Sequence, residues 1–168
     1  MDDGWFGCRN DDRSSLGDWQ VNEEKLGGSL AEFVNKINAL GIKFGIWYEP
    51  EMISRDSELY NNHPDWCISC PDRVPLESRQ QLVLDMTRAE VVDYLFDSMS
   101  AVISENNISY VKWDMNRSIT DNYSSALSEN QGELSHRYIL VVYRLMARLT
   151  EAFPGVFFEG CASGGGRN

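Results

Sequence analysis

The sequence predicts an α/β fold with parallel β/α packing, a partial TIM barrel that forms a single catalytic domain over residues 1–168. Three observations support this prediction. Long segments carry the apolar period of amphipathic helices, short apolar runs alternate with them, and residues capable of chemistry stand where those runs end. The length suits one well-buried domain and is short for two.

Helical periodicity marks three long segments, at residues 29–40, 88–106 and 135–152. Apolar residues recur every three to four positions in each, so each has one face suited to a core. Gly41 ends the first segment and Pro154 follows the third, as expected of helix C-termini.

Short apolar runs of strand length alternate with these helices. They lie at residues 1–5, 42–48, 81–85, 108–114 and 156–161, and the first looks like the end of a strand. This alternation indicates about five parallel strands with helices between them.

Nearly every predicted strand ends in a residue capable of chemistry. These residues are Asp2, Asp3, Trp47, Glu49, Asp85, Lys112, Asp114 and Cys161. A ring of such residues is typical of barrel enzymes, whereas an open doubly wound sheet concentrates its chemistry at one crevice. The pattern therefore favours a barrel, and about five of eight strands make it half-barrel-like. Open sheet edges recruit partners, so we expect a homo-oligomer in which one chain covers the open side of another.

Composition excludes several kinds of partner. The net charge of −11, from 26 acidic and 15 basic residues, argues against nucleic acid. No apolar run approaches the ~18–20 residues of a membrane span, so we expect no membrane partner. The first residues lack the features of a secretory signal, and four cysteines are too few for a disulfide scaffold. We expect a cytoplasmic protein with reduced thiols.

A CxxC pair, Cys67 and Cys70, follows His63 by a few residues. A zinc site usually needs four ligands, and only these three lie together in the sequence. Small side chains in a loop are the simpler interpretation, and we expect no metal and no cofactor.

Lys112 and Asp114 stand two residues apart at the end of a predicted strand. Because side chains alternate along a strand, both point to one side, where the cation would lower the pKa of the carboxylate. An ionised aspartate in a sugar-binding mouth can attack an anomeric carbon. The spacing alone is also satisfied by a structural Lys–Asp pair.

Residues 112–117, KWDMNR, resemble the nucleophile segment of the glycoside hydrolase family 36 α-galactosidases. Other segments resemble the same family in the same order and cover essentially the whole chain. They are residues 2–7, 15–19, 43–52, 63–66, Arg79 with residues 82–85, and residues 161–167. Seven ordered segments are far more specific than any one of them.

This resemblance implies a retaining α-galactosidase that cleaves terminal α-galactosyl residues, with galactose or α-galactosides as ligands. Asp114 would be the nucleophile, and Lys112 would hold a ring hydroxyl and keep Asp114 charged. Asp2 and Asp3 would accept hydrogen bonds from the galactose O4 and O6 hydroxyls, although two adjacent carboxylates could instead bind a cation or be solvated. Trp47 would form an apolar wall, although a lone tryptophan is more often a core residue.

The resemblance assigns four further residues to substrate binding. Arg79 would bond a hydroxyl or order a carboxylate, and Asn116 would touch the sugar or orient the nucleophile. Cys161 and Gly164 would line the floor near the sugar's O2. Residues 163–166 are rich in glycine, but they match neither common phosphate-binding pattern, so close backbone approach to a ligand is the better interpretation.

A retaining glycosidase needs a second carboxylate about 5–5.5 Å from the nucleophile. The family places it on the sixth barrel strand, after the Cys–Gly segment, and residues 1–168 do not contain it. Glu49, Glu51 and Glu159 are no obvious substitutes. We therefore expect the 168-residue chain alone to have little or no activity. The alternative is a non-catalytic half-barrel scaffold or a sugar-binding protein derived from that family.

Overall fold

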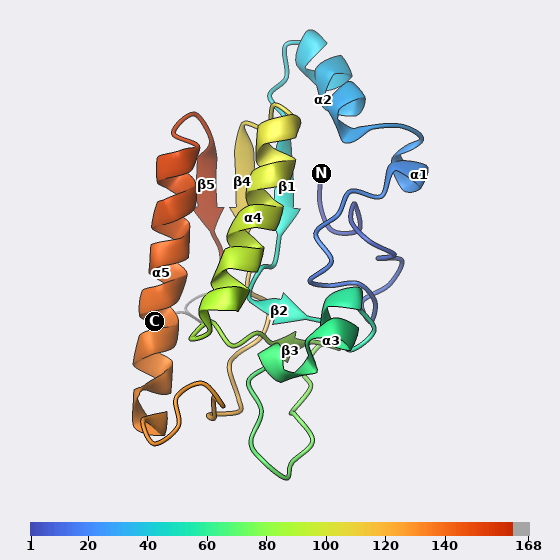
Figure 1. The fold of residues 1–168 in the computed structure, drawn as a ribbon. Helices are drawn as coiled ribbons and strands as arrows, with labels where there is room; N and C mark the ends of the chain where they lie inside the picture. Colours follow the sequence, from blue (N-terminus) through green and yellow to red (C-terminus); the bar gives the residue numbers. More distant parts are fainter. Residues whose placement is uncertain (163–168) are drawn as a thin grey trace.

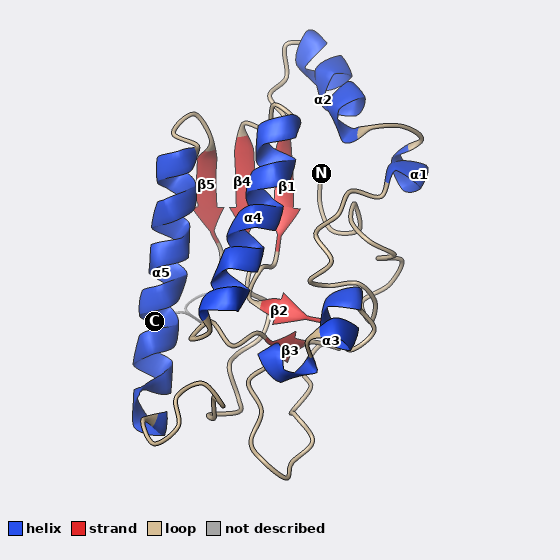
Figure 2. Ribbon diagram, in the orientation of Figure 1, coloured by secondary structure: helices blue, strands red, loops and turns tan. Residues whose placement is uncertain are grey.

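A three-stranded parallel sheet with helices against one face forms the body of the molecule (Figure 1). The structure is a computed structural model and describes residues 1–162. A second, two-stranded antiparallel sheet lies beyond the C-terminal ends of the parallel strands (Figure 2).

The elements follow one another in the alternating order that the sequence predicts. The helices are α1 (Glu23–Leu26), α2 (Leu30–Ala39), α3 (Glu58–Asn62), α4 (Ala89–Glu105) and α5 (Leu134–Ala152), with 3₁₀ turns η1 (Pro64–Trp66) and η2 (Gln131–Glu133). The strands are β1 (Gly45–Tyr48), β2 (Met52–Ile53), β3 (Leu82–Val83), β4 (Tyr110–Trp113) and β5 (Phe157–Gly160).

The three long predicted helices are confirmed as α2, α4 and α5, with ends within two residues of those expected. Ser29 caps α2 by accepting a hydrogen bond from the Glu32 amide, and Gly41 follows the helix with φ of 78°. The apolar stripes of α4 and α5 are buried at Val91, Leu95 and Met99 of α4 and at further positions of both helices.

Strands β1, β4 and β5 lie in sheet order as they do in the chain, all parallel. Each neighbouring pair is joined by a crossover that contains a long helix, α4 or α5, and Figure 1 shows both helices on the same face of the sheet. Helices on a single face and an unreversed strand order are what a β/α barrel requires, whereas a doubly wound sheet reverses its strand order at a switch point, and the three strands here show no such reversal. The partial barrel is thus confirmed.

The opening segment extends this sheet at the free edge of β1. The Met1 amino group donates to the Gly45 carbonyl at 2.6 Å, and the Trp47 amide donates to the Met1 carbonyl at 3.0 Å. This is the pairing pattern of a parallel strand, although it extends over one residue only. The pairing sets Asp2 beside Trp47.

The predicted strand at residues 81–85 is corrected by the structure. Leu82 and Val83 pair antiparallel with β2, in a sheet apart from the parallel one. Leu82, Val83 and Leu84 are all buried. A strand buried on both faces is a continuous apolar run in either kind of sheet, so the sequence alone does not show which sheet this run joins. Arg79 and Gln80, both with positive φ, form the tight turn that leads into β3.

Alternation along the parallel strands divides the sheet into two different faces. Ile46 and Val111 are buried towards the helices. The opposite face carries Tyr110 and Lys112, both half-buried, and Phe157, which is 66% exposed. In the described chain no element covers this second face of β4 and β5.

We predict that Gly45→Ala destabilises the fold by about 1–3 kcal/mol. A Cβ at Gly45 would stand 2.5 Å from Cδ1 and 3.1 Å from Cβ of Tyr110, on the neighbouring strand. Urea unfolding followed by tryptophan fluorescence would measure the loss. Gly132→Ala is the matched control, because an added Cβ there meets nothing within 4 Å; equal stability of both variants would contradict the prediction.

Candidate active site

The site lies where the three parallel strands end, and the strand register determines its composition. Trp47 is aligned with Lys112, and Lys112 is aligned with Glu159. Residues aligned on parallel neighbours share one face of the sheet. Two residues further along each chain, just after the strands end, stand Glu49, Asp114 and Cys161.

The Asp114 carboxylate is buried and accepts several hydrogen bonds. Its Oδ2 atom accepts from the Trp47 indole nitrogen at 3.2 Å and from Asn116 Nδ2 at 2.9 Å. Its Oδ1 atom accepts from the Met115 amide at 3.1 Å, and the Cys161 thiol is a further donor. The carboxylate is therefore held by groups from β1, from the turn after β4 and from the end of β5.

These hydrogen bonds decide the ionisation of Asp114. Burial alone raises the pKa of this carboxyl, but the bonds from Asn116, Trp47, Cys161 and Met115 favour the charged form and bring its pKa below the ordinary value. Asp114 is therefore a carboxylate at neutral pH, which is the form that its predicted role as a nucleophile requires.

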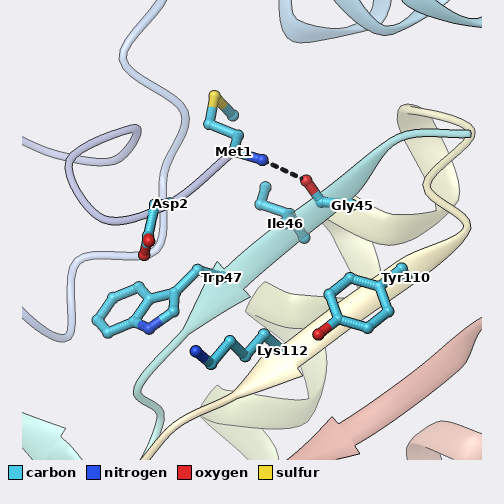
Figure 3. Close-up of a pocket in the computed structure, with 7 residues that line it drawn as sticks. All are labelled: Met1, Asp2, Gly45, Ile46, Trp47, Tyr110 and Lys112. Carbon is cyan, nitrogen blue, oxygen red and sulfur yellow. Dashed lines mark hydrogen bonds between the residues drawn. The ribbon is translucent and has the colours of Figure 1, made fainter. Parts of the chain in front are cut away.

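A pocket of about 280 Å³ opens on the uncovered face of the sheet at Trp47, the residue whose indole donates to Asp114, and Asp114 itself is not among its lining residues (Figure 3). Its lining residues are Met1, Asp2, Gly45, Ile46, Trp47, Tyr110 and Lys112. The Trp47 ring and the Lys112 ammonium extend along this face, with the Asp2 carboxylate beside the indole (Figure 3). An aromatic wall, a cation and an acceptor thus meet in one pocket.

Lys112 has no ion pair and no side-chain hydrogen bond within the described part of the chain, and none joins it to Asp114. The expected role of Lys112 in keeping Asp114 charged therefore remains a prediction, since hydrogen-bond donors already favour the ionised form. Its ammonium instead points into the pocket, where a ligand oxygen could accept from it (Figure 3).

Two of the predicted site residues, Asp3 and Arg79, lie apart from this pocket. The Asp3 carboxylate is held by Arg9, with Nη2–Oδ2 at 2.9 Å, and this guanidinium is 4% exposed. Arg79 is exposed in the turn before β3. Gly164 lies outside the described residues, so the structure gives it no position.

One buried residue near Asp114, Glu49, was not among the predicted site residues. Glu49 accepts from the Asn116 amide at 2.6 Å and from Gln81 Nε2 at 2.8 Å. Burial raises the pKa of Glu49, and the nearby Asp114 charge raises it further. The only signal in the sequence was the position of Glu49, two residues after Trp47 at a strand end.

The CxxC pair shows no metal site among residues 1–162, where no group of three or more His, Cys, Asp or Glu side chains could hold an ion. Cys67 is buried, and burial raises the pKa of its thiol to about 12. The His63 ring stacks on Trp66 at 4.0 Å between centroids. Within the same range, no helix is both long and apolar enough to cross a bilayer.

The sequence matches a known protein family over its whole length. The melibiase family matches residues 1–168 of the chain. The chain belongs to this family, the α-galactosidases of glycoside hydrolase family 36. The bifunctional α-galactosidase/sucrose kinase AgaSK of Mediterraneibacter gnavus is 56% identical over 167 residues, which cover 99% of this chain and 17% of that protein. Alpha-galactosidase AgaA of Geobacillus stearothermophilus is 53% identical over 168 residues, which cover 99% of this chain and 23% of that protein.

Solved α-galactosidases have the same fold over this region. The crystal structure of the Lactobacillus brevis α-galactosidase superposes with a TM-score of 0.95 at 56% identity, covering 99% of this chain and 22% of that one. The melibiase chain therefore spans less than a quarter of the length of these relatives.

We predict that Asn116→Leu raises the pKa of Asp114. The substitution removes the 2.9 Å hydrogen bond to Oδ2 and leaves the carboxyl buried, so the charged form loses support while the desolvation remains. Titration of the Asp114 ¹³Cγ resonance by NMR would measure the shift. Asn38→Leu, in α2, is the control, and an unchanged Asp114 titration in Asn116→Leu would show that this bond does not hold the charge.

Proposed function

We propose that residues 1–168 form the nucleophile half of a retaining α-galactosidase site. The buried, ionised Asp114 at the end of β4 carries this proposal, because it accepts a hydrogen bond from Trp47, which lines an open pocket together with the unpaired cation Lys112. Attack of Oδ on the anomeric carbon would form a galactosyl ester and break the bond to the leaving oxygen.

The pocket residues suit a galactosyl unit. Trp47 can pack against the apolar C–H face of the sugar, and the Asp2 carboxylate can accept hydrogen bonds from hydroxyls. Lys112 can donate to a ring hydroxyl, and Cys161 supports Asp114 from β5. Asp3 is held by Arg9, so we assign it an indirect role in placing Asp2.

Solved relatives support α-galactosides as the ligand class. Variants of AgaA of Geobacillus stearothermophilus have been crystallised in complex with raffinose and with stachyose, and these structures superpose on this chain with TM-scores of 0.95 and 0.93. We therefore propose that the pocket takes the terminal galactosyl unit of such sugars.

Among the described residues, Asp2 is the carboxylate that lines the pocket, and we assign it to hydroxyl binding; the other carboxylates near Asp114 and Lys112 already accept hydrogen bonds. Both Glu49 oxygens accept hydrogen bonds, and Glu51 accepts from Trp113 and Tyr138. Glu159 Oε2 accepts from the Tyr110 hydroxyl at 2.7 Å. General acid–base catalysis contributes about 10²–10⁴-fold, and we propose that the chain alone has little or no activity on glycosides with poor leaving groups.

A second candidate function is a non-catalytic half-barrel that binds sugar or serves as a scaffold. The uncovered face of the sheet, where Phe157 is 66% exposed, favours it, because exposed apolar surface suits a protein that binds a partner. The two candidates differ in whether Asp114 becomes galactosylated.

We predict that the chain releases a burst of up to one equivalent of 2,4-dinitrophenol from 2,4-dinitrophenyl α-galactoside, with a mass increase of one hexosyl group on Asp114. An activated phenolate leaves without protonation, so the missing acid matters least for this substrate. Rapid-quench kinetics with intact mass spectrometry and peptide mapping would measure both.

Asp114→Asn is the control for this burst and should give neither 2,4-dinitrophenol nor adduct. Lack of a burst with the unsubstituted chain would favour the scaffold candidate. Turnover of raffinose at a rate typical of a complete enzyme would contradict the proposed low activity.

We also propose that the isolated chain forms homo-oligomers. Edge strand β5 has no further strand beside it in the described chain, and Phe157 and Tyr110 stack on the uncovered face with centroids 6.1 Å apart. Unpaired edges and exposed apolar surface favour association. Multi-angle light scattering should give a mass above 19.2 kDa, and Phe157→Glu should shift it towards the monomer; a monomeric unsubstituted chain would overturn this proposal.

A further inference from the structure

A buried carboxylate lies directly behind the proposed nucleophile. Glu49 follows β1 by one residue and is 1% exposed, so it cannot reach a sugar in the pocket. Its Oε1 atom accepts from the Asn116 backbone amide at 2.6 Å, and Asn116 Nδ2 in turn donates to Asp114 Oδ2 at 2.9 Å. Asn116 therefore connects the two carboxylates.

We infer that Glu49 is a positioning residue that fixes the turn after β4 and thereby orients Asp114 through Asn116. The inference rests on the proposed role of Asp114 as the nucleophile. Residues 114–117 belong to no helix or strand, so no regular ladder of backbone bonds fixes this turn. A short bond to a buried carboxylate supplies that constraint, and a charged acceptor strengthens it.

The other oxygen of Glu49 is anchored as well. Its Oε2 atom accepts from Gln81 Nε2 at 2.8 Å, and the Gln81 carbonyl accepts from Arg117 Nη1 at 2.6 Å. Arg117, 6% exposed, belongs to the same turn as Asn116. The bonds thus close a ring from the turn through Gln81 and Glu49 back to the turn, and this ring limits the positions that Asn116 can take.

The position of Glu49 is costly for a carboxylate. Burial and the neighbouring charge of Asp114 both oppose its ionisation, as the raised pKa of Glu49 indicates. A buried apolar residue of similar volume would avoid this cost, but it could not accept from the Asn116 amide. Only a side chain with a hydrogen-bond acceptor at this position can hold the turn after β4 through the Asn116 amide.

Two substitutions separate the geometry of Glu49 from its charge. Glu49→Gln keeps the length and an acceptor for Asn116, and the Gln81 amide can turn its buried, unpartnered Oε1 towards the new donor. Glu49→Asp keeps the charge but shortens the side chain by one methylene, so it cannot hold both partners. Asp18→Asn is the matched control, since Asp18 is 4% exposed and accepts from the Glu58 and Leu59 amides in another part of the fold.

The test measures two quantities in each variant of the whole chain. The first is the rate of galactosylation of Asp114 by 2,4-dinitrophenyl α-galactoside, and the second is the NMR resonances of the Asn116 side-chain amide. We expect Glu49→Asp to slow galactosylation by about 10–100-fold and to move the Asn116 signals towards those of a solvent-exposed amide. Glu49→Gln and Asp18→Asn should stay within about threefold in rate and keep the Asn116 signals.

The opposite pattern would overturn the inference. If Glu49→Asp matches the unsubstituted chain and Glu49→Gln loses rate, charge and not position is what Glu49 provides. If the unsubstituted chain forms no adduct, the proposed function fails in this chain, and the Asn116 signals still decide whether Glu49 positions the turn. Unmoved Asn116 signals in Glu49→Asp would then refute the positioning role.

Discussion

The in-register pairing of three parallel strands determines every feature of the site. Because Trp47, Lys112 and Glu159 are aligned, the residues that follow them leave the sheet at one edge and on one side. A slip of one residue in β4 would turn Lys112 and Asp114 towards the helices and bring Val111 to the open face. Such a slip would expose Val111, which is now buried with Ile46 on the helix side of the sheet, and would therefore destabilise the fold. The packing of the core thus also determines which side chains face the site.

Around Asp114 the protein uses hydrogen bonds to hold a charge that burial opposes. Two carboxylates lie close to Asn116, and their surroundings move their pKa values in opposite directions. The pKa of Asp114 falls because donors converge on it, whereas burial dominates at Glu49 and raises its pKa. Such a division of roles between neighbouring acids is common in glycosidase sites, where one group must remain charged.

Much of this was predictable from the sequence. The three long helices are confirmed because each has a complete apolar stripe, and Ser29 and Gly41 bound α2. The strands that carry Trp47 and Asp114 are confirmed because each is an apolar run between two such helices. Family membership could be predicted because seven segments resemble the family in the same order, which is far more specific than one motif alone.

Other features depend on tertiary contacts that periodicity does not encode. The run at Leu82 is as apolar as a barrel strand, and only its pairing with β2 shows that it belongs to another sheet. Adjacent Asp2 and Asp3 are equivalent in the sequence, but Arg9 holds only the second. Glu49 contacts the turn after β4 through a hydrogen bond from a backbone amide 67 positions away in the sequence, and no local sequence pattern predicts such a contact.

Binding of a single sugar tests most directly whether the strand ends form one galactose site. The Trp47 indole N–H donates to Asp114 and lines the pocket, so its NMR signal reports on both. Titration with methyl α-galactoside should shift this signal and those of Asn116 and Lys112, while methyl α-glucoside, which differs at O4, should shift them far less. Equal responses to both sugars, or shifts confined to residues away from the pocket, would contradict the account.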